Sequence, residues 1–282
     1  MSEETNREAP IELDTSAKDT PVQAEGTCCP IVELRHYLHH PGRREEFIAL
    51  FDEYFIEEQE RYGAFIPGQF RDRTDPDRFV WLRGFHDMQT RRIALEDFYH
   101  GSPLWQAHRT EANDTISDVS NVFLLRPARV ATGFCFDPAN RPTRDALEVA
   151  GGVISATIYA FDSPVDPQFV DFFENTMIPL LRKAGATLLG HFVTEPAENT
   201  YPALPVREGE NVFVWFASFA DEAAYRSYHS ALTQNQEWIT SIVPALQMWG
   251  ASLEEALELL PTRRSLLCHR AEEQETRKDF GE

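Results

Sequence analysis

The sequence predicts an α+β fold made of two tandem βαββαβ units, each with an antiparallel sheet and both helices on one face. Two observations lead to this fold class. Residues 78–85 alternate with a period of two and then give way to a helical period, which indicates a strand followed by a helix. The Phe79-Val80-Trp81 of this strand recurs at residues 213–215, and residues 37–70 align without a gap with residues 159–192. Such self-similarity indicates an internal duplication.

The elements of the first unit follow from local patterns. Residues 31–38, 64–72, 78–85 and 121–126 alternate as strands do, and a helix with apolar positions from Phe47 to Phe55 connects the first two. A second helix follows residue 87 and is interrupted at Gly101-Ser102-Pro103. Ser102 is suited to be an N-cap and Pro103 to be the first residue of a restarted helix.

The predicted domains are a first repeat at residues 31–128, a linker at 129–152 and a second, divergent repeat at 153–267. The linker is rich in Pro, Arg, Asp and Gly. The acidic tails at 1–30 and 268–282 have few apolar residues and are predicted to be disordered. Residues 253–260 fit either a short helix or a closing strand.

A βαββαβ sheet leaves one face without helices, and two tandem copies can cover these faces by packing sheet against sheet. We expect the aliphatic side chains of the strands to face the helices. The aromatic and charged side chains would then line the space between the sheets.

Composition limits the function. The chain has 282 residues, 42% of them hydrophobic, and a net charge of −20, which argues against nucleic acids and anionic membranes as partners. No apolar run is long enough to span a bilayer, and the start of the chain lacks the features of an export signal. The four cysteines show no disulfide or metal spacing, so a cytoplasmic location is expected.

Several stretches of the first unit resemble the NIPSNAP family. They are Val32-Glu33-Leu34-Arg35-His36-Tyr37 with His40-Pro41-Gly42-Arg43, Gly68-Gln69-Phe70-Arg71-Asp72, residues 79–85, and Trp105-Gln106-Ala107-His108-Arg109. The resemblance covers roughly residues 31–127 and implies the dimeric α/β-barrel superfamily of ferredoxin-like domains, here with both units of the barrel in one chain. That superfamily includes cofactor-independent monooxygenases, isomerases, haem enzymes and proteins without an assigned reaction, so the fold does not determine the function.

The two copies differ mainly in polar residues. Arg35, Arg71, Arg83, His108 and Arg109 of the first copy align with Thr157, Val193, Ala217, Ser241 and Ile242 of the second. Aromatic positions are kept: Tyr37, Trp81 and Trp105 align with Tyr159, Trp215 and Trp238. We therefore expect the first repeat to carry any site and the second to be structural.

Two interpretations of the arginines remain open. Strand parity places Arg35, Arg71 and Arg83 on one face with Tyr37, Gln69 and Trp81, where guanidinium groups could bind an anionic or carbonyl-bearing ligand. Trp105 and Arg109 would complete this substrate site. Alternatively, Glu33, Asp72 and Glu195 pair with the arginines, which then hold the sheets in register.

For catalysis, the candidates are His108 as a general base and Arg71. His108 or His191 could also serve as an axial haem ligand, although a core role is common for such histidines. His36, His39 and His40 do not form a metal-ligand pattern, and no Gly-rich phosphate loop or nucleophile motif is present, so no metal or cofactor is expected.

The function expected from the sequence is binding of a small aromatic, oxygenated or anionic molecule, with nucleotide-independent oxygenation or isomerisation as the reaction if there is one. The alternative is a non-catalytic binding or assembly module that acts through protein partners. A homodimer is compatible with either function.

Overall fold

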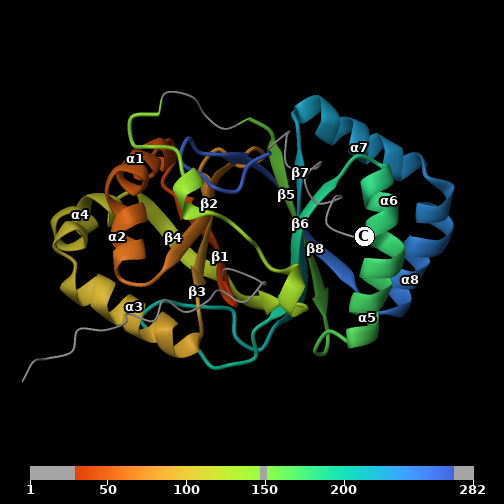
Figure 1. Ribbon diagram of the computed structural model, residues 1–282, viewed down its shortest axis with the longest axis horizontal. Coiled ribbons are helices and arrows are strands. Elements are labelled where there is room, and N and C mark those ends of the chain that lie inside the picture. Colours follow the sequence, from red (N-terminus) through yellow and green to blue (C-terminus); the bar gives the residue numbers. More distant parts are fainter. Residues whose placement is uncertain (1–28, 147–150, 270–282) are drawn as a thin grey trace, which may run out of the picture.

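Eight antiparallel strands close into one barrel in the order β1-β3-β2-β8-β5-β7-β6-β4, with helices outside it (Figure 1). This arrangement was obtained as a computed structural model that describes residues 29–146 and 151–269. The predicted fold class, two βαββαβ repeats whose sheets form a barrel within one chain, is confirmed.

The strands of the two repeats are β1 (Ile31–His39), β2 (Phe65–Asp72), β3 (Arg78–Phe85), β4 (Ile116–Pro127), β5 (Val153–Phe161), β6 (Thr187–Thr194), β7 (Asn211–Phe219) and β8 (Ser252–Pro261). The helices are α1 (Arg44–Leu50), α2 (Ile56–Arg61), α3 (Met88–Gly101), α4 (Pro103–Asn113), α5 (Pro167–Phe172), α6 (Ile178–Lys183), α7 (Glu222–Gln234) and α8 (Val243–Met248). Single π-turns η1 (Phe51–Phe55) and η4 (Phe173–Met177) join α1 to α2 and α5 to α6, and a third, η5 (Trp238–Ile242), leads into α8. Two 3₁₀ turns, η2 (Val130–Thr132) and η3 (Pro138–Asn140), lie between the repeats. The stretch that fitted either a helix or a strand is the closing strand β8.

Each repeat contributes four neighbouring strands, and the repeats meet at the β2–β8 and β4–β6 edges. Helices α1 to α4 cover the first sheet and α5 to α8 cover the second, at opposite sides of the molecule (Figure 1). The predicted break between α3 and α4 is present: the Ser102 side chain accepts a hydrogen bond from the Trp105 amide, and Pro103 begins α4. Local sequence therefore determines where these helices start.

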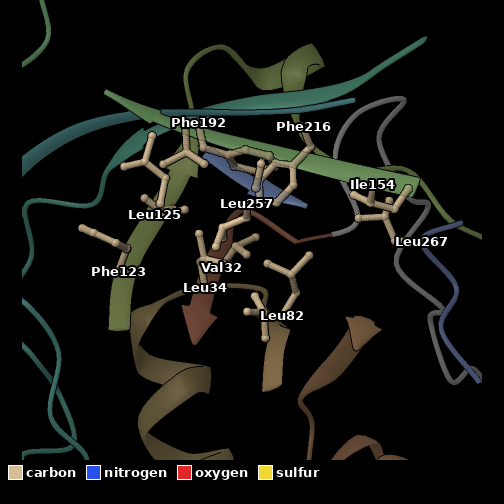
Figure 2. Packing of buried hydrophobic residues seen from close by; sticks show 14 of the residues in the cluster. Val32, Leu34, Leu82, Phe123, Leu125, Ile154, Phe192, Phe216, Leu257 and Leu267 are labelled. Atoms are coloured by element: carbon tan, nitrogen blue, oxygen red, sulfur yellow. The ribbon is translucent and has the colours of Figure 1, made fainter. Parts of the chain in front are cut away.

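The barrel interior is apolar and is built by both repeats. Figure 2 shows Val32, Leu34 and Leu82 of the first repeat packed among Ile154, Phe192, Phe216 and Leu257 of the second. The expectation that the aliphatic side chains face the helices was therefore wrong. An eight-stranded barrel has just enough room for side chains to fill it, and a charged group there would find no water. The aromatic and charged face of the first sheet instead lies under α1 to α4.

The two ends of the barrel are closed differently. At one end Phe134, from the predicted linker, packs against Phe192 and Phe216, and Cys29 and Leu267 join the same apolar core. The predicted linker thus contributes to the barrel core. The predicted tails lie almost entirely outside the described residues, apart from Cys29, Pro30, Cys268 and His269.

At the other end, inward-facing positions of the strands carry polar groups. Arg78 pairs with Asp72 at 2.6 Å and with Glu255 at 2.5 Å, and His36 Nδ1 lies 2.9 Å from the Asn121 amide nitrogen. Burial and the charge of Arg78 lower the pKa of His36 to about 3. His36 is therefore neutral in the folded protein near neutral pH.

We expect Phe134→Ala to lower the free energy of unfolding by about 3–5 kcal/mol. The change leaves a cavity in the barrel core, and the surrounding side chains can relax into it only in part. The half-buried Phe136 is the matched control, and Phe136→Ala should cost clearly less. Urea denaturation at neutral pH measures both. A loss for Phe134→Ala no larger than for Phe136→Ala would show that the linker is not part of the core.

We also expect the unfolding free energy to fall as the pH drops from about 6.5 towards 3, because the unfolded His36 binds a proton in this range and the folded one does not. His36→Asn should remove up to about 1.4 kcal/mol per pH unit of this dependence. His86→Asn, at an exposed position, is the control. Denaturation curves at pH 7 and pH 5 test the prediction, and an identical pH dependence in wild type and His36→Asn would contradict it.

Candidate functional site

A buried cluster of three arginines surrounds a single glutamate on the helix-facing side of the first sheet. Glu33 Oε2 accepts hydrogen bonds from Arg35 Nη1 at 2.9 Å and Arg83 Nε at 2.8 Å, and Glu33 Oε1 accepts one from Arg91 Nε at 2.8 Å. All four side chains are fully buried. Three guanidinium groups share one carboxylate, so two positive charges of the cluster are not compensated by ion pairs among the described residues.

The elements of the first repeat bring these four groups together. Glu33 on β1 is registered opposite Arg83 on β3, and Arg35 opposite Trp81. Arg91 comes from the first turn of α3, which begins where the Asp87 side chain caps the helix by accepting a hydrogen bond from the Thr90 amide. The sheet thus supplies three members and the helix N-terminus supplies the fourth.

The cluster keeps its charges at neutral pH. Burial by itself would raise the pKa of the Glu33 carboxyl, but the charges of Arg83, Arg35 and Arg91 hold it far below its usual range. Burial lowers the pKa of Arg91. Burial also acts to lower the pKa of Arg35, but Tyr37 and Glu33 outweigh it, and the pKa of Arg35 is raised above its usual value. The Nη2 atom of Arg35 has no hydrogen-bond partner among the described residues.

Three further side chains connect the cluster to a cavity. The Tyr37 hydroxyl accepts from Arg35 Nε at 3.3 Å, and Arg83 Nη1 donates to Gln59 Oε1 at 3.0 Å and to the Tyr99 hydroxyl at 3.4 Å. Tyr37, Gln59 and Tyr99 all line the cavity. The arginines therefore lie directly behind its wall.

The cavity has a volume of about 250 Å³ and lies between the first sheet and helices α1 to α4, outside the barrel. Its walls are mostly aromatic: Tyr37, Phe47, Phe51, Phe55, Trp81, Phe98, Tyr99, Trp105 and Tyr201, with Gln59, Asn113, Ile116, Val119, Ala203 and Leu204 completing them. Tyr37 and Trp81 meet edge to face at 5.6 Å, and Phe55 and Trp105 at 5.5 Å. Such walls suit a flat apolar ring system.

Trp81 joins the charged and aromatic parts of the site. The guanidinium carbons of Arg83 and Arg35 lie 5.1 and 5.6 Å from the centre of its ring. The side chain is only 2% exposed, and its indole N–H has no hydrogen-bond partner among the described residues. A buried donor without an acceptor is costly, so an acceptor supplied by a ligand or by water is expected here.

The structure places five of the residues predicted from the sequence at this site: Arg35, Tyr37, Trp81, Arg83 and Trp105. Of the acidic partners considered, Glu33 pairs with two of these arginines, whereas Asp72 pairs with Arg78. Gln69 is buried on the same face beside Asp52 and does not line the cavity.

The remaining predicted residues lie elsewhere. Arg71 makes a two-point bond with Glu45 of α1, at 2.9 and 2.6 Å, near the surface. His108 stacks on Tyr54 with ring centres 3.8 Å apart, and Arg109 is exposed. None of these three lines the cavity.

His191, the other candidate haem ligand, pairs with Glu174 of the second repeat at 2.9 Å. Among the residues that the structure describes, no group of three or more His, Cys, Asp or Glu side chains is placed to hold a metal ion. Nor is any described helix long and apolar enough to cross a membrane.

Sequence reasoning missed Arg91, Gln59, Tyr99 and Tyr201. Arg91 could have been found from the sequence. When residues 81 and 215 are aligned, Arg91 corresponds to Tyr225 of the second copy, and a loss of an arginine between the copies is the same signal that singled out Arg35. Tyr201 carried no such signal, since it lies in a loop without a counterpart of similar length in the first repeat.

The second repeat keeps the geometry and loses the charges. Ser155 is registered opposite Ala217, as Glu33 is opposite Arg83, and Thr157 takes the place of Arg35. Tyr225 packs against Phe219 at 5.1 Å where Arg91 would reach inward. The charged cluster is therefore specific to the first repeat.

Comparisons with known proteins give the following similarities. No protein-family model and no curated protein matches the sequence. A solved structure of a proposed monooxygenase from Fusobacterium nucleatum is 8% identical, covers 83% of this chain and 93% of its own, and has a TM-score of 0.49. An anthrone oxidase-like protein is 13% identical, with 88% and 98% covered and a TM-score of 0.49.

NIPSNAP proteins are also among the similar structures, as the resemblance of residues 31–127 predicted. A NIPSNAP domain protein from Burkholderia xenovorans is 20% identical, covers 38% of this chain and 99% of its own, and has a TM-score of 0.32. The part of this chain that it covers is about the length of one repeat.

Proposed function

We propose that the first repeat binds a flat, oxygen-bearing aromatic anion in the cavity between its sheet and α1 to α4. The observation that carries the proposal is an aromatic cavity with buried positive charges directly behind its wall. Buried charges are normally compensated, and here one carboxylate serves three guanidinium groups. A ligand carboxylate, phenolate or enolate would supply the missing negative charge.

The size of the cavity limits the ligand. Its volume of about 250 Å³ lies just below the range of roughly 300–1,000 Å³ that is usual for sites of drug-sized ligands. One or two fused rings with a single acidic substituent are therefore the preferred class. The unpaired indole N–H of Trp81 can donate to an oxygen of that substituent.

The site would also favour the ionised form of a bound enol or phenol, because positive charge in a water-poor environment stabilises the anion. This is the form that oxygenation or isomerisation without a nucleotide requires. The lining residues include no His, Asp or Glu that could remove the proton. That observation favours the second candidate function, binding without catalysis.

Trp81→Phe tests the binding mode. It should weaken binding of 2-naphthoate about three- to tenfold in isothermal titration calorimetry, the amount expected for one lost hydrogen bond. Trp215→Phe is the matched control, because Trp215 is also buried with an unpaired N–H but lies in the second repeat. It should leave the affinity unchanged. Equal effects of the two changes, or wild-type protein that binds 2-naphthylmethanol as tightly as 2-naphthoate, would contradict the proposal.

Catalysis and binding can be told apart with a hydroxylated ligand. The protein is incubated in air with 1-hydroxy-2-naphthoate, and the ligand is analysed by mass spectrometry. Gain of oxygen that depends on Trp81 and Arg83 would indicate a monooxygenase. Unchanged ligand that still binds would indicate a binding module.

Glu33→Gln tests the charge balance itself. The change leaves three buried guanidinium groups without a carboxylate, and we expect a loss of at least about 3 kcal/mol in the unfolding free energy. Measurement at pH 7 is appropriate, because the folded pKa of Glu33 is depressed and its contribution is lost only as the pH falls below about 4.3.

Ser155→Ala, at the equivalent position of β5, is the control for Glu33→Gln. The Ser155 hydroxyl has no hydrogen-bond partner in the described part of the chain, so this change should cost less than about 1 kcal/mol. Stability of Glu33→Gln within that same margin would mean that the arginines do not need the carboxylate.

A further inference from the structure

A segment of the second repeat forms part of the wall of the cavity in the first repeat. This wall segment, residues 195–210, connects β6 to β7. Three of its residues, Tyr201, Ala203 and Leu204, line the cavity. The proposed site is therefore incomplete without the second half of the chain.

The wall segment is attached to the charged cluster. Arg91 Nη1 donates to Asn199 Oδ1 and Thr200 Oγ1, both at 3.0 Å, while its Nε bonds Glu33. The Thr200 hydroxyl also donates to the Met88 carbonyl oxygen at 3.2 Å, at the start of α3. One guanidinium group thus links the segment to the carboxylate behind the cavity.

Packing holds the segment against the helices of the first repeat. The ring of Tyr201 stacks on Tyr99 at 5.9 Å with an interplanar angle of 15°, and Tyr201 is buried with Leu95 and Ala94 of α3. Asn199 bonds the Tyr201 amide and the Leu204 carbonyl and so closes the turn between them. Tyr201 is consequently fixed deep in the wall, whereas Leu204 is half-buried and Ala203 is exposed at the rim.

The arrangement is not reciprocal. The equivalent connection of the first repeat, between β2 and β3, is only five residues long (73–77), against sixteen for the wall segment. It reaches the second repeat through ion pairs of Arg73 with Glu222 and Glu258. Within residues 29–146 and 151–269, it is the first repeat that receives a cavity wall from its neighbour in this way.

We infer that the wall segment determines which ligands the first repeat accepts, with Leu204 as the residue that sets the permitted ligand length. The inference rests on the proposed function, because it specifies the ligand class of the same site. Leu204 is half-buried, lines the cavity and packs against the apolar cluster that contains Tyr201, so truncating it enlarges the cavity. Tyr201 serves as the positioning residue that seats the segment on Tyr99.

Size selection is measured by calorimetry with benzoate, 2-naphthoate and anthracene-2-carboxylate. Leu204→Ala should raise the affinity for the three-ring acid relative to the two-ring acid by at least about tenfold, the scale of discrimination that apolar walls provide. Leu204→Trp should lower the affinity for 2-naphthoate by a similar factor. The control is Val206→Ala, in the same segment but outside the cavity lining, which should leave the ratios unchanged.

A readout without any ligand separates this inference from the proposed function. Acrylamide quenching of tryptophan fluorescence should increase in Tyr201→Ala, because Tyr201 and Trp105 line the same cavity and opening its wall exposes Trp105. Trp105→Phe should abolish the increase. Increased quenching without binding of any acid would support the role of the wall segment in closing the cavity and would overturn the proposed function. Binding with the same size ratios in wild type, Leu204→Ala and Leu204→Trp would overturn the inference and leave the proposed function standing.

Discussion

The fold depends on the need to cover the inner face of two four-stranded sheets. Each repeat has helices on one side of its sheet only, so the other, aliphatic side must be removed from water by the neighbouring repeat. Closing both sheets into one barrel buries these faces and pairs the sheet edges through β2–β8 and β4–β6. Because apolar side chains from both repeats then fill most of the interior, the aromatic cavity lies in the space between the first sheet and its helices.

Having both repeats in one chain allows them to diverge. In the first, Glu33, Arg35, Arg83 and Arg91 occupy the positions under the helices, at the cost of burying charges that only partly compensate one another. In the second, Ser155, Thr157, Ala217 and Tyr225 occupy these positions, and aromatic and aliphatic side chains such as Phe173 and Trp215 form a continuous apolar core. The second repeat thus packs an apolar core against a first repeat whose buried charges are only partly compensated.

Arg91 connects the charged cluster of the first repeat to the second repeat. This side chain pairs with Glu33, and it also bonds the segment of the second repeat that borders the cavity. A site with these features is organised by contacts between repeats as well as by the barrel. The helices that border its aromatic lining, α3 and α4, begin at the N-cap residues Asp87 and Ser102.

Sequence by itself determined the duplication, the order of the strands along the chain and the break before α4, because these follow from local periodicity and from capping residues that act on their own turn. It also singled out Arg35 and Arg83, because an amino-acid difference between two aligned copies is visible without coordinates, and Tyr37, Trp81 and Trp105, because these aromatic residues recur in both copies. It did not determine which face of the strands points inward. Alternation separates the two faces of a strand, but when both are covered only the closure of the barrel decides which of them is inside. Only the tertiary structure showed that Arg71 pairs with Glu45, that His108 stacks on Tyr54, and that Tyr201 stacks on Tyr99, which lies about a hundred residues earlier in the chain. Such contacts depend on how distant segments pack and not on the neighbouring residues in the sequence.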